Sequence, residues 1–306
     1  MKRDGPKNIV ASVQAKLVER SRELGVEHQL TLARFGGERL LYRLSKSEFA
    51  DRFILKGAAL LLLWLGEPIR PTKDVDLLGF GDTSAGALKR VFVDLCAIES
   101  PDDGLRFLPE TVHVEAIRED QEYGGMRVKL MAMLGNVRIP LQVDVGAGDA
   151  VVPAPEVFDY PGLLDLPRAR LRAYRPETSI AEKTEAMVRL ALANSRMKDF
   201  FDIHRLAETR SFDGETLRLA VAATFERRGI EIPGERPLAL TSEFADDAQK
   251  KIQWAAFVRR ARRSELADLS AIIATLDGFL WPVLQAAAQG KPWAKKWRSG
   301  GPWKEL

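Results

Sequence analysis

The sequence predicts an α+β protein with two lobes, an N-terminal mixed β-sheet with helices and a C-terminal lobe made only of helices. Three observations support this prediction. Helical and strand patterns interleave up to about residue 150, a proline-rich stretch follows, and only helical patterns appear from Ser179 onward. We therefore expect a front lobe over residues 1–150, a connecting segment over 151–178 and a helical lobe over 179–306.

Helices and strands alternate in the front lobe. Helical patterns predict helices over residues 8–24, 27–34, 41–51, 57–65 and 84–98. Apolar runs and alternating patterns predict strands over residues 52–55, 72–80, 112–119, 125–134 and 137–149. Gly36-Gly37 is expected to end the second helix, and the turn dipeptide Gly135-Asn136 joins the last two strands into a pair.

The second half of the chain has a different pattern. Residues 151–167, VVPAPEVFDYPGLLDLP, are rich in proline and are interpreted as a linker or a draped loop. The helical lobe that follows is expected to contain helices over residues 179–193, 197–209, 214–228, 245–263 and 267–285.

Composition limits the class of protein. Hydrophobic residues make up 46% of 306 residues, which is enough for a core and excludes global disorder. Cys96 is the single cysteine, so a disulfide framework or a cysteine-rich zinc site is excluded. The longest apolar run, GAALLLLWLG, falls short of the roughly 20 residues that span a bilayer, and no signal peptide is recognisable, so we expect a cytoplasmic protein without a membrane partner.

The C-terminal third carries basic and aromatic clusters. The basic clusters at 258–263 and 291–304 suit a polyanionic partner, although such clusters are more often ordinary solvated surface. Five tryptophans also lie late in the chain, at Trp254, Trp281, Trp293, Trp297 and Trp303. We interpret most of them as core or docking residues, with stacking on bases as the alternative.

Asp74 and Asp76 lie two residues apart in an otherwise apolar strand. Strand side chains alternate, so the two carboxylates share one face about 6.5–7 Å apart, and Val75 and Leu77 point to the core. Two like charges at that distance repel each other unless a cation lies between them. The pair therefore suits a hard cation such as Mg²⁺, whose oxygen ligands lie at about 2.0–2.1 Å. Aspartates that merely face water are the alternative.

A third carboxylate has the same phase on a later strand. The apolar residues of VRIPLQVDVGAG occupy one face, which leaves Asp144 on the other with Gln142. If this strand lies beside the first, Asp144 faces Asp74 and Asp76. Three such carboxylates can hold one or two metal ions about 3.5–4 Å apart, which would clamp the attacking and leaving oxygens of a phosphoryl group.

The turn before this strand is suited to an anion. Gly57 stands at a strand-to-helix turn, where backbone N–H groups can approach a phosphate. Arg70 lies shortly before the aspartates and would add a charge-assisted contact. Taken alone, the glycine is equally typical of a tight turn.

The segment LKGAALLLLWLGEPIRPTKDVDLL resembles the first motif of the DNA-polymerase-β-like nucleotidyltransferases, and more narrowly that of the AbiEii/AbiGii toxin family, which includes the MenT toxins. That motif is a glycine turn, a helix and an Arg-x-Thr-x-Asp-(Ile/Leu/Val)-Asp strand, matched here by Arg70, Thr72, Asp74, Val75 and Asp76. One departure concerns the serine or threonine that follows the turn glycine in many relatives. Here Ala58 and Ala59 stand there, so either backbone amides suffice or nucleotide binding is altered.

The back lobe also resembles this family, in which a lysine on an early helix precedes an aspartate on the next. SIAEKTEAMVRLALANSRMKDFFDIHRL supplies Lys183, then Asp199 and Asp202, with Asp199 preferred for the final motif. Lys183 lies in an apolar helical stripe, which favours a partner for its ammonium group; extension to water is the alternative. The aspartates either orient Lys183 or form ion pairs with Arg196, Lys198 or Arg205.

The resemblance implies a two-lobed nucleotidyltransferase fold and a toxin of a type IV, abortive-infection-like toxin–antitoxin pair. It implies Mg²⁺ or Mn²⁺ as cofactor, a nucleoside triphosphate as substrate, the 3′ end of a tRNA as acceptor and a cognate antitoxin as partner. The metal ligands would be Asp74, Asp76 and Asp144, with Asp144 either a third ligand or the base that takes a proton from the attacking hydroxyl, and the catalytic group adds Lys183 and Asp199. The nucleotide contacts would be Lys56, Gly57, Ala58, Arg70, Thr72, Lys183 and Asp202. Modification of a protein hydroxyl and a non-catalytic nucleotide-binding module remain the alternatives.

Overall fold

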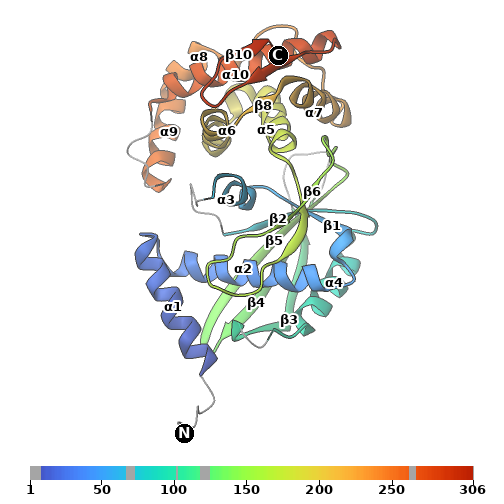
Figure 1. Cartoon of the computed structure of the whole chain (residues 1–306), viewed down its shortest axis with the longest axis vertical. Coiled ribbons are helices and arrows are strands. Elements are labelled where there is room, and N and C mark those ends of the chain that lie inside the picture. The colour runs from blue at the N-terminus through green and yellow to red at the C-terminus, as the bar shows by residue number, and fades with distance from the viewer. Residues whose placement is uncertain (1–7, 67–72, 101–102, 118–124, 262–266, 306) are drawn as a thin grey trace. The chain divides into compact units, whose positions relative to one another are not determined.

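The computed structural model describes residues 8–66, 73–100, 103–117, 125–261 and 267–305 (Figure 1). The chain divides into two compact units. The first contains residues 1–148 and 156–173, and the second contains residues 149–155 and 174–306. Each unit has its own sheet and its own buried apolar residues, and each is described by itself.

The first unit is built on a seven-stranded mixed sheet with the order β3-β4-β5-β2-β1-β7-β6. Its strands are β1 (Phe53–Lys56), β2 (Val75–Gly79), β3 (Leu105–Ala116), β4 (Met126–Leu134), β5 (Val137–Ala147), β6 (Glu156–Asp159) and β7 (Arg170–Ala173). β2 pairs with β5 and β1 pairs with β7 in parallel, whereas the other neighbours are antiparallel. The predicted mixed sheet with helices is confirmed.

The helices of the first unit are α1 (Ile9–Glu23), α2 (His28–Lys46), α3 (Ala59–Leu65) and α4 (Ala85–Ala97), with a short 3₁₀ turn at Ala50–Arg52. In Figure 1, α2 runs across the sheet; it packs on β5, and α4 packs on β3. The predicted helix over residues 84–98 is confirmed by α4, whose buried stripe contains Leu88, Val91, Phe92 and Leu95.

The predicted break at Gly36-Gly37 is wrong, because α2 continues through both glycines. A Cβ atom at Gly36 would lie 2.8 Å from a methyl carbon of Leu141, and one at Gly37 would lie 3.2 Å from a methyl carbon of Val75. The glycines therefore let the helix approach β5 and β2 closely. The gain from packing exceeds the roughly 1 kcal/mol that each glycine costs within a helix.

A second difference concerns the segment from 151 to 178. The sequence predicts a linker or draped loop over residues 151–167 of this connecting segment, yet β6 lies within that loop, β7 follows it, and both extend the first sheet at its edge. Leu171 and Ala173 are buried, so β7 carries a short apolar alternation. Because β7 is only four residues long and follows several prolines, its alternating pattern is weak in the sequence. β3 likewise begins earlier than predicted and contains a register shift between Leu108 and His113.

The second unit contains the helices α5 (Pro176–Leu190), α6 (Met197–Thr209), α7 (Gly214–Arg227), α8 (Ser242–Asp246), α9 (Ala248–Ala261) and α10 (Leu269–Gln289), with 3₁₀ turns at Ala191–Ala193 and Leu238–Leu240. The prediction of helices alone is wrong, because β8 (Phe212–Asp213), β9 (Lys295–Trp297) and β10 (Trp303–Glu305) form a small sheet. These strands are two or three residues long, too short for an alternating pattern to show.

Two of the late tryptophans pack on one phenylalanine of the second unit. Trp297 and Trp303 pack on Phe279 with ring centroids 4.8 and 5.6 Å away. The indole N–H of Trp297 donates to the carbonyl of Ala207 at 2.7 Å, and that of Trp303 donates to Phe279 at 2.9 Å. The interpretation as a core residue is confirmed for Trp297, which is buried, whereas Trp303 is half-buried at the edge of the same aromatic group.

Helix α10 is the central apolar element of the second unit. Within the described part of the chain, it alone is long and apolar enough to cross a membrane by length and composition. It packs against α6, α7 and α8. Its buried side chains include Ile272, Ile273, Leu276, Phe279, Leu280, Val283 and Leu284. This is the burial pattern of a core helix.

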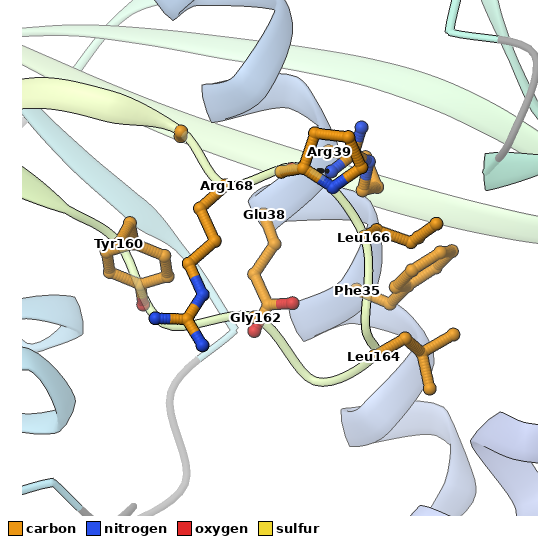
Figure 2. Close-up of a pocket in the computed structure, with 10 residues that line it drawn as sticks. Phe35, Glu38, Arg39, Tyr160, Gly162, Leu164, Leu166 and Arg168 are labelled. Atoms are coloured by element: carbon orange, nitrogen blue, oxygen red, sulfur yellow. Dashed lines mark hydrogen bonds between the residues drawn. The ribbon is translucent and has the colours of Figure 1, made fainter.

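A buried carboxyl group fixes α2 to the loop between β6 and β7. Figure 2 shows Glu38 among the side chains of a small pocket of about 10 Å³ that also contains Tyr160 and Arg168. The carboxylate accepts from Arg34 Nε at 2.8 Å and from the backbone N–H of Leu163 at 2.9 Å. Burial raises the pKa of Glu38 from 4.5 to about 7, because these contacts offset only part of the lost hydration.

Glu38 should therefore make the first unit less stable as the pH rises. Between pH 4.5 and 7 the folded protein keeps a proton that the unfolded chain releases, so the free energy of unfolding falls by about 3 kcal/mol over this window. We expect Glu38→Gln to remove that decline in urea unfolding at pH 5 and pH 8. The exposed Glu48→Gln is the control and should keep the wild-type slope. Equal slopes in all three proteins would contradict the assignment.

Candidate functional site

One row of charged residues crosses five neighbouring strands of the first sheet. The register pairs Asp76 of β2 with Asp144 of β5. On one side Asp76 pairs with Lys56 of β1, and on the other side Asp144 pairs with Arg127 of β4. Arg127 is in turn opposite Glu115 of β3. Directly paired residues point to the same face of a sheet, so these side chains share one face.

Asp74 joins the same face one step before β2 begins. Val75, between the two aspartates, is buried and faces α2. Its methyl carbon would lie 3.2 Å from a Cβ atom added to Gly37 of α2. Alternation therefore places Asp74 and Asp76 on the face opposite α2. Asp74 is exposed and Asp76 is half-buried, so both carboxylates are accessible from that face.

Asp144 forms a two-point ion pair with Arg127. The Nε of Arg127 donates to Oδ1 at 2.9 Å and its terminal nitrogen donates to Oδ2 at 2.8 Å. These hydrogen bonds raise the pKa of Arg127 above its ordinary value, and the nearby charge of Asp74 adds to the effect. A planar guanidinium holds a carboxylate at fixed orientation, so Arg127 sets the direction of the Asp144 oxygens.

The carboxylates fit a divalent cation through Asp74 and Asp76. The described residues contain no group of three or more His, Cys, Asp or Glu side chains arranged to hold a metal ion. Both oxygens of Asp144 are bonded to Arg127, one hydrogen bond to each. Asp74 and Asp76 supply two oxygen donors on one face, which a hard cation prefers. The role of Asp144 as third ligand stays a prediction, and each of its oxygens keeps a lone pair that Arg127 does not use.

Gly57 lies directly against Asp76. Its φ of +73° is in the left-handed region, and a Cβ atom there would lie 1.9 Å from Oδ2 of Asp76. Only glycine fits both the backbone conformation and this approach. Ala58 caps the seven-residue helix α3 without a side-chain hydrogen bond. Of the predicted nucleotide contacts, Lys56 ends β1 opposite Asp76, and Gly57 and Ala58 form the turn that follows, whereas Arg70 and Thr72 are outside the described residues.

In the second unit, Lys183 of α5 joins the two predicted aspartates of α6. Its ammonium group donates to Oδ1 of Asp199 at 2.8 Å and to Oδ2 of Asp202 at 3.0 Å. Lys183 is 9% exposed and both aspartates are buried, so the alternative of an ammonium group extended into water is wrong. Asp199 also pairs with Arg196 at 2.6 Å, so it both orients Lys183 and forms one of the ion pairs considered from the sequence.

Electrostatics keep Asp199 ionised within this buried cluster. Burial acts most strongly and would raise its pKa, but the charges of Lys183 and Arg196 together outweigh burial and hold the pKa of Asp199 below its ordinary value. The cluster is therefore a set of compensated charges, in which each member depends on the others.

Arg127 is the site residue that sequence reasoning missed. The signal for it was present, because Gly135-Asn136 is a two-residue turn between β4 and β5. Counting outward in step from that turn pairs Leu134 with Val137 and ends with Arg127 opposite Asp144. A hairpin register combined with the Asp144 prediction would have found it.

Replacing Lys183 should destabilise the second unit. Lys183→Met leaves Asp199 and Asp202 buried with Arg196 as the remaining cation, and we expect a loss of about 3–5 kcal/mol in the free energy of unfolding at neutral pH. The loss should shrink at low pH, where the aspartates become protonated. Lys198→Met removes the same charge from an exposed position of α6 and serves as the control. Urea unfolding in which both variants match the wild type would disprove the proposed dependence.

Comparisons with solved structures gave weak similarity. The chain is 16% identical to JHP933 from Helicobacter pylori with a TM-score of 0.44, covering 86% of this chain and 91% of that one. It is 17% identical to a putative nucleotidyltransferase from H. pylori with a TM-score of 0.43, covering 86% of this chain and 94% of that one. Similarity at this level supports no argument about the site. No curated protein matched the chain.

A protein-family comparison is decisive. Residues 39–286 match the family described as "Nucleotidyl transferase AbiEii toxin, Type IV TA system". The matched range contains the charged row of the first unit and the lysine–aspartate cluster of the second. Family membership implies a nucleoside triphosphate as substrate and an antitoxin as partner. The chain belongs to the AbiEii nucleotidyltransferase toxins of type IV toxin–antitoxin systems.

Proposed function

We propose that this nucleotidyltransferase uses Mg²⁺ or Mn²⁺ to transfer a nucleotide to the 3′ end of a tRNA in the cytoplasm. The observation that carries the proposal is the row in which Asp76 and Asp144 occupy paired positions on parallel strands, with Asp74 on the same face. Family analogy alone suggests the tRNA acceptor. The proposed toxic effect follows from the consumption of this acceptor, and the antitoxin would oppose it.

Asp74 and Asp76 would hold the cation, which when bound neutralises charge on the phosphates. Asp144 would take the proton from the attacking hydroxyl of the acceptor. The oxygen of that hydroxyl forms a bond to the α-phosphorus while the bond to pyrophosphate breaks in line with it. Arg127 would orient Asp144 through its two hydrogen bonds.

The triphosphate would lie against the turn after β1. Lys56 is opposite Asp76 in the register, and the backbone of Gly57 lies against the Asp76 carboxylate. Ala58 offers only its backbone, so Lys56 and, from the sequence motif, Arg70 and Thr72 would carry the side-chain contacts. We assign Lys183, Asp199 and Asp202 to nucleotide binding as well, with the ion pairs fixing the position of Lys183 in the second unit.

Ala58 and Ala59 favour one alternative, a nucleotide-binding module without catalysis, because the side-chain hydroxyl of many relatives is absent here. Transfer to a protein hydroxyl is the other alternative, since these residues do not identify the acceptor. Labelled triphosphates incubated with the protein, a divalent cation and either tRNA or total protein separate the three functions. Label on protein alone would exclude the tRNA acceptor, and no label on either would favour the module.

Asp76→Asn should abolish this transfer while leaving the fold intact. We expect a loss of at least about 100-fold in the rate of label incorporation, because several kcal/mol of charge stabilisation at the phosphoryl group would be lost. Asp159→Asn changes an exposed carboxylate of β6 in the same unit and is the control. If the two variants transfer label equally fast, the row of carboxylates is not the catalytic site.

Gly57→Ala should impair transfer by moving Asp76. The added Cβ would occupy the space of the carboxylate, and we expect at least a roughly tenfold loss of activity. Gly66→Ala is a matched control, because Gly66 has a similar φ of +76° but nothing within 4 Å of the added atom. Both variants should lose about 1 kcal/mol of stability from backbone strain. An equal loss of activity in both would show that strain, and not the clash, is responsible.

A further inference from the structure

The first unit has a cavity beside Asp74 on the side of β5. Its volume is about 350 Å³, and α2, β3, β4 and β5 contribute to its lining together with Lys73 and Asp74. Binding sites for small molecules in proteins begin at about 300 Å³, so the cavity has room for one nucleoside. The pairing of β2 with β5 begins at Val75 and Val143. The cavity thus lies where the edge of β5 extends beyond the start of β2.

The lining combines an apolar floor with polar groups. Met131 and Pro140 are paired across β4 and β5 on the face that carries Gln142 and Asp144, whereas Leu141 faces α2. Gln142 and Lys129 form the next pair along the same strands. A base suits such a floor, and the Gln142 amide can both donate and accept hydrogen bonds. The two lysines suit the phosphate of a nucleic-acid chain, and Lys129, which is paired with Glu115 at 2.5 Å, would exchange that partner for the phosphate.

The sheet order separates this cavity from the triphosphate turn. β1 and Gly57 lie on one side of β2, and β5 and the cavity lie on the other. An in-line displacement places the attacking hydroxyl and the leaving pyrophosphate on opposite sides of the phosphorus. If the phosphates lie along the turn after β1, the acceptor must approach from the side of β5, where Asp144 is positioned to take its proton.

We propose that this cavity holds the terminal nucleoside of a single-stranded RNA acceptor and presents its hydroxyl to Asp144. The inference rests on the proposed function and adds the location of the acceptor. It assigns Met131 and Pro140 to the floor, Gln142 to contact with the base, and Lys73 and Lys129 to the adjoining phosphate. The donor triphosphate lies outside it.

A pair of methionines on β4 allows a controlled test. Met131→Glu puts a negative charge into the cavity, whereas Met133→Glu puts the same charge two residues along the same strand, outside the lining. Binding is measured by the fluorescence anisotropy of a labelled single-stranded RNA with a free 3′ hydroxyl, in the absence of triphosphate. We expect Met131→Glu to weaken binding at least about tenfold more than Met133→Glu.

The other outcomes overturn the inference. An equal effect of both variants would mean that general charge repulsion, and not the cavity, determines binding. A higher KM for the triphosphate in Met131→Glu with unchanged RNA binding would assign the cavity to the donor nucleotide. If Met131→Glu does not fold, Lys129→Gln replaces it, with Arg138→Gln as the exposed control on β5 outside the lining. The same difference in RNA binding is then expected, and its absence overturns the inference.

This binding test is independent of catalysis. If wild-type protein labels neither RNA nor protein, the proposed function fails, while the difference between Met131→Glu and Met133→Glu in RNA binding still decides the use of the cavity. If label is transferred to RNA and both variants bind RNA equally, the function stands and the acceptor location is wrong.

Discussion

The parallel pairing of β2 with β5 is the constraint on which the candidate site depends. It places Asp76 beside Asp144 although α4, β3 and β4 separate them in the chain. Two neighbouring carboxylates repel each other, so nearby positive charges are needed to offset the repulsion. The strand register supplies them by pairing Asp76 with Lys56 on one side and Asp144 with Arg127 on the other. α2 packs closely on both paired strands, an approach that Gly36 and Gly37 permit.

Arg127 gives Asp144 a fixed orientation. The two-point ion pair uses one lone pair of each Asp144 oxygen. The remaining lone pairs leave room for a cation held by Asp74 and Asp76 or for the proton of an attacking hydroxyl. Arg127 is therefore a positioning residue for either proposed role of Asp144, third ligand or base.

The two units solve the problem of buried charge in different ways. In the first, the carboxylates stay at least partly accessible, so a cation and a substrate can reach them. In the second, Lys183, Asp199 and Asp202 are buried and compensate one another, which favours fixed positions over exchange of partners. The first arrangement suits chemistry on a bound group, and the second suits a rigid contact.

The sequence by itself determined the elements with strong periodicity and the residues with an unusual type for their position. Asp74, Asp76, Asp144 and Lys183 were identifiable because charged residues are rare on strands and helices that are otherwise apolar. Tertiary structure decided what depends on partners distant in the chain: α2 passing through Gly36-Gly37, β6 and β7 joining the sheet, and Arg127 binding Asp144. These features follow from packing and strand register, whose energies exceed the local conformational preferences of the residues. The sequence alone can predict such a feature only where a short turn fixes the strand pairing, as it does for Arg127 and Asp144.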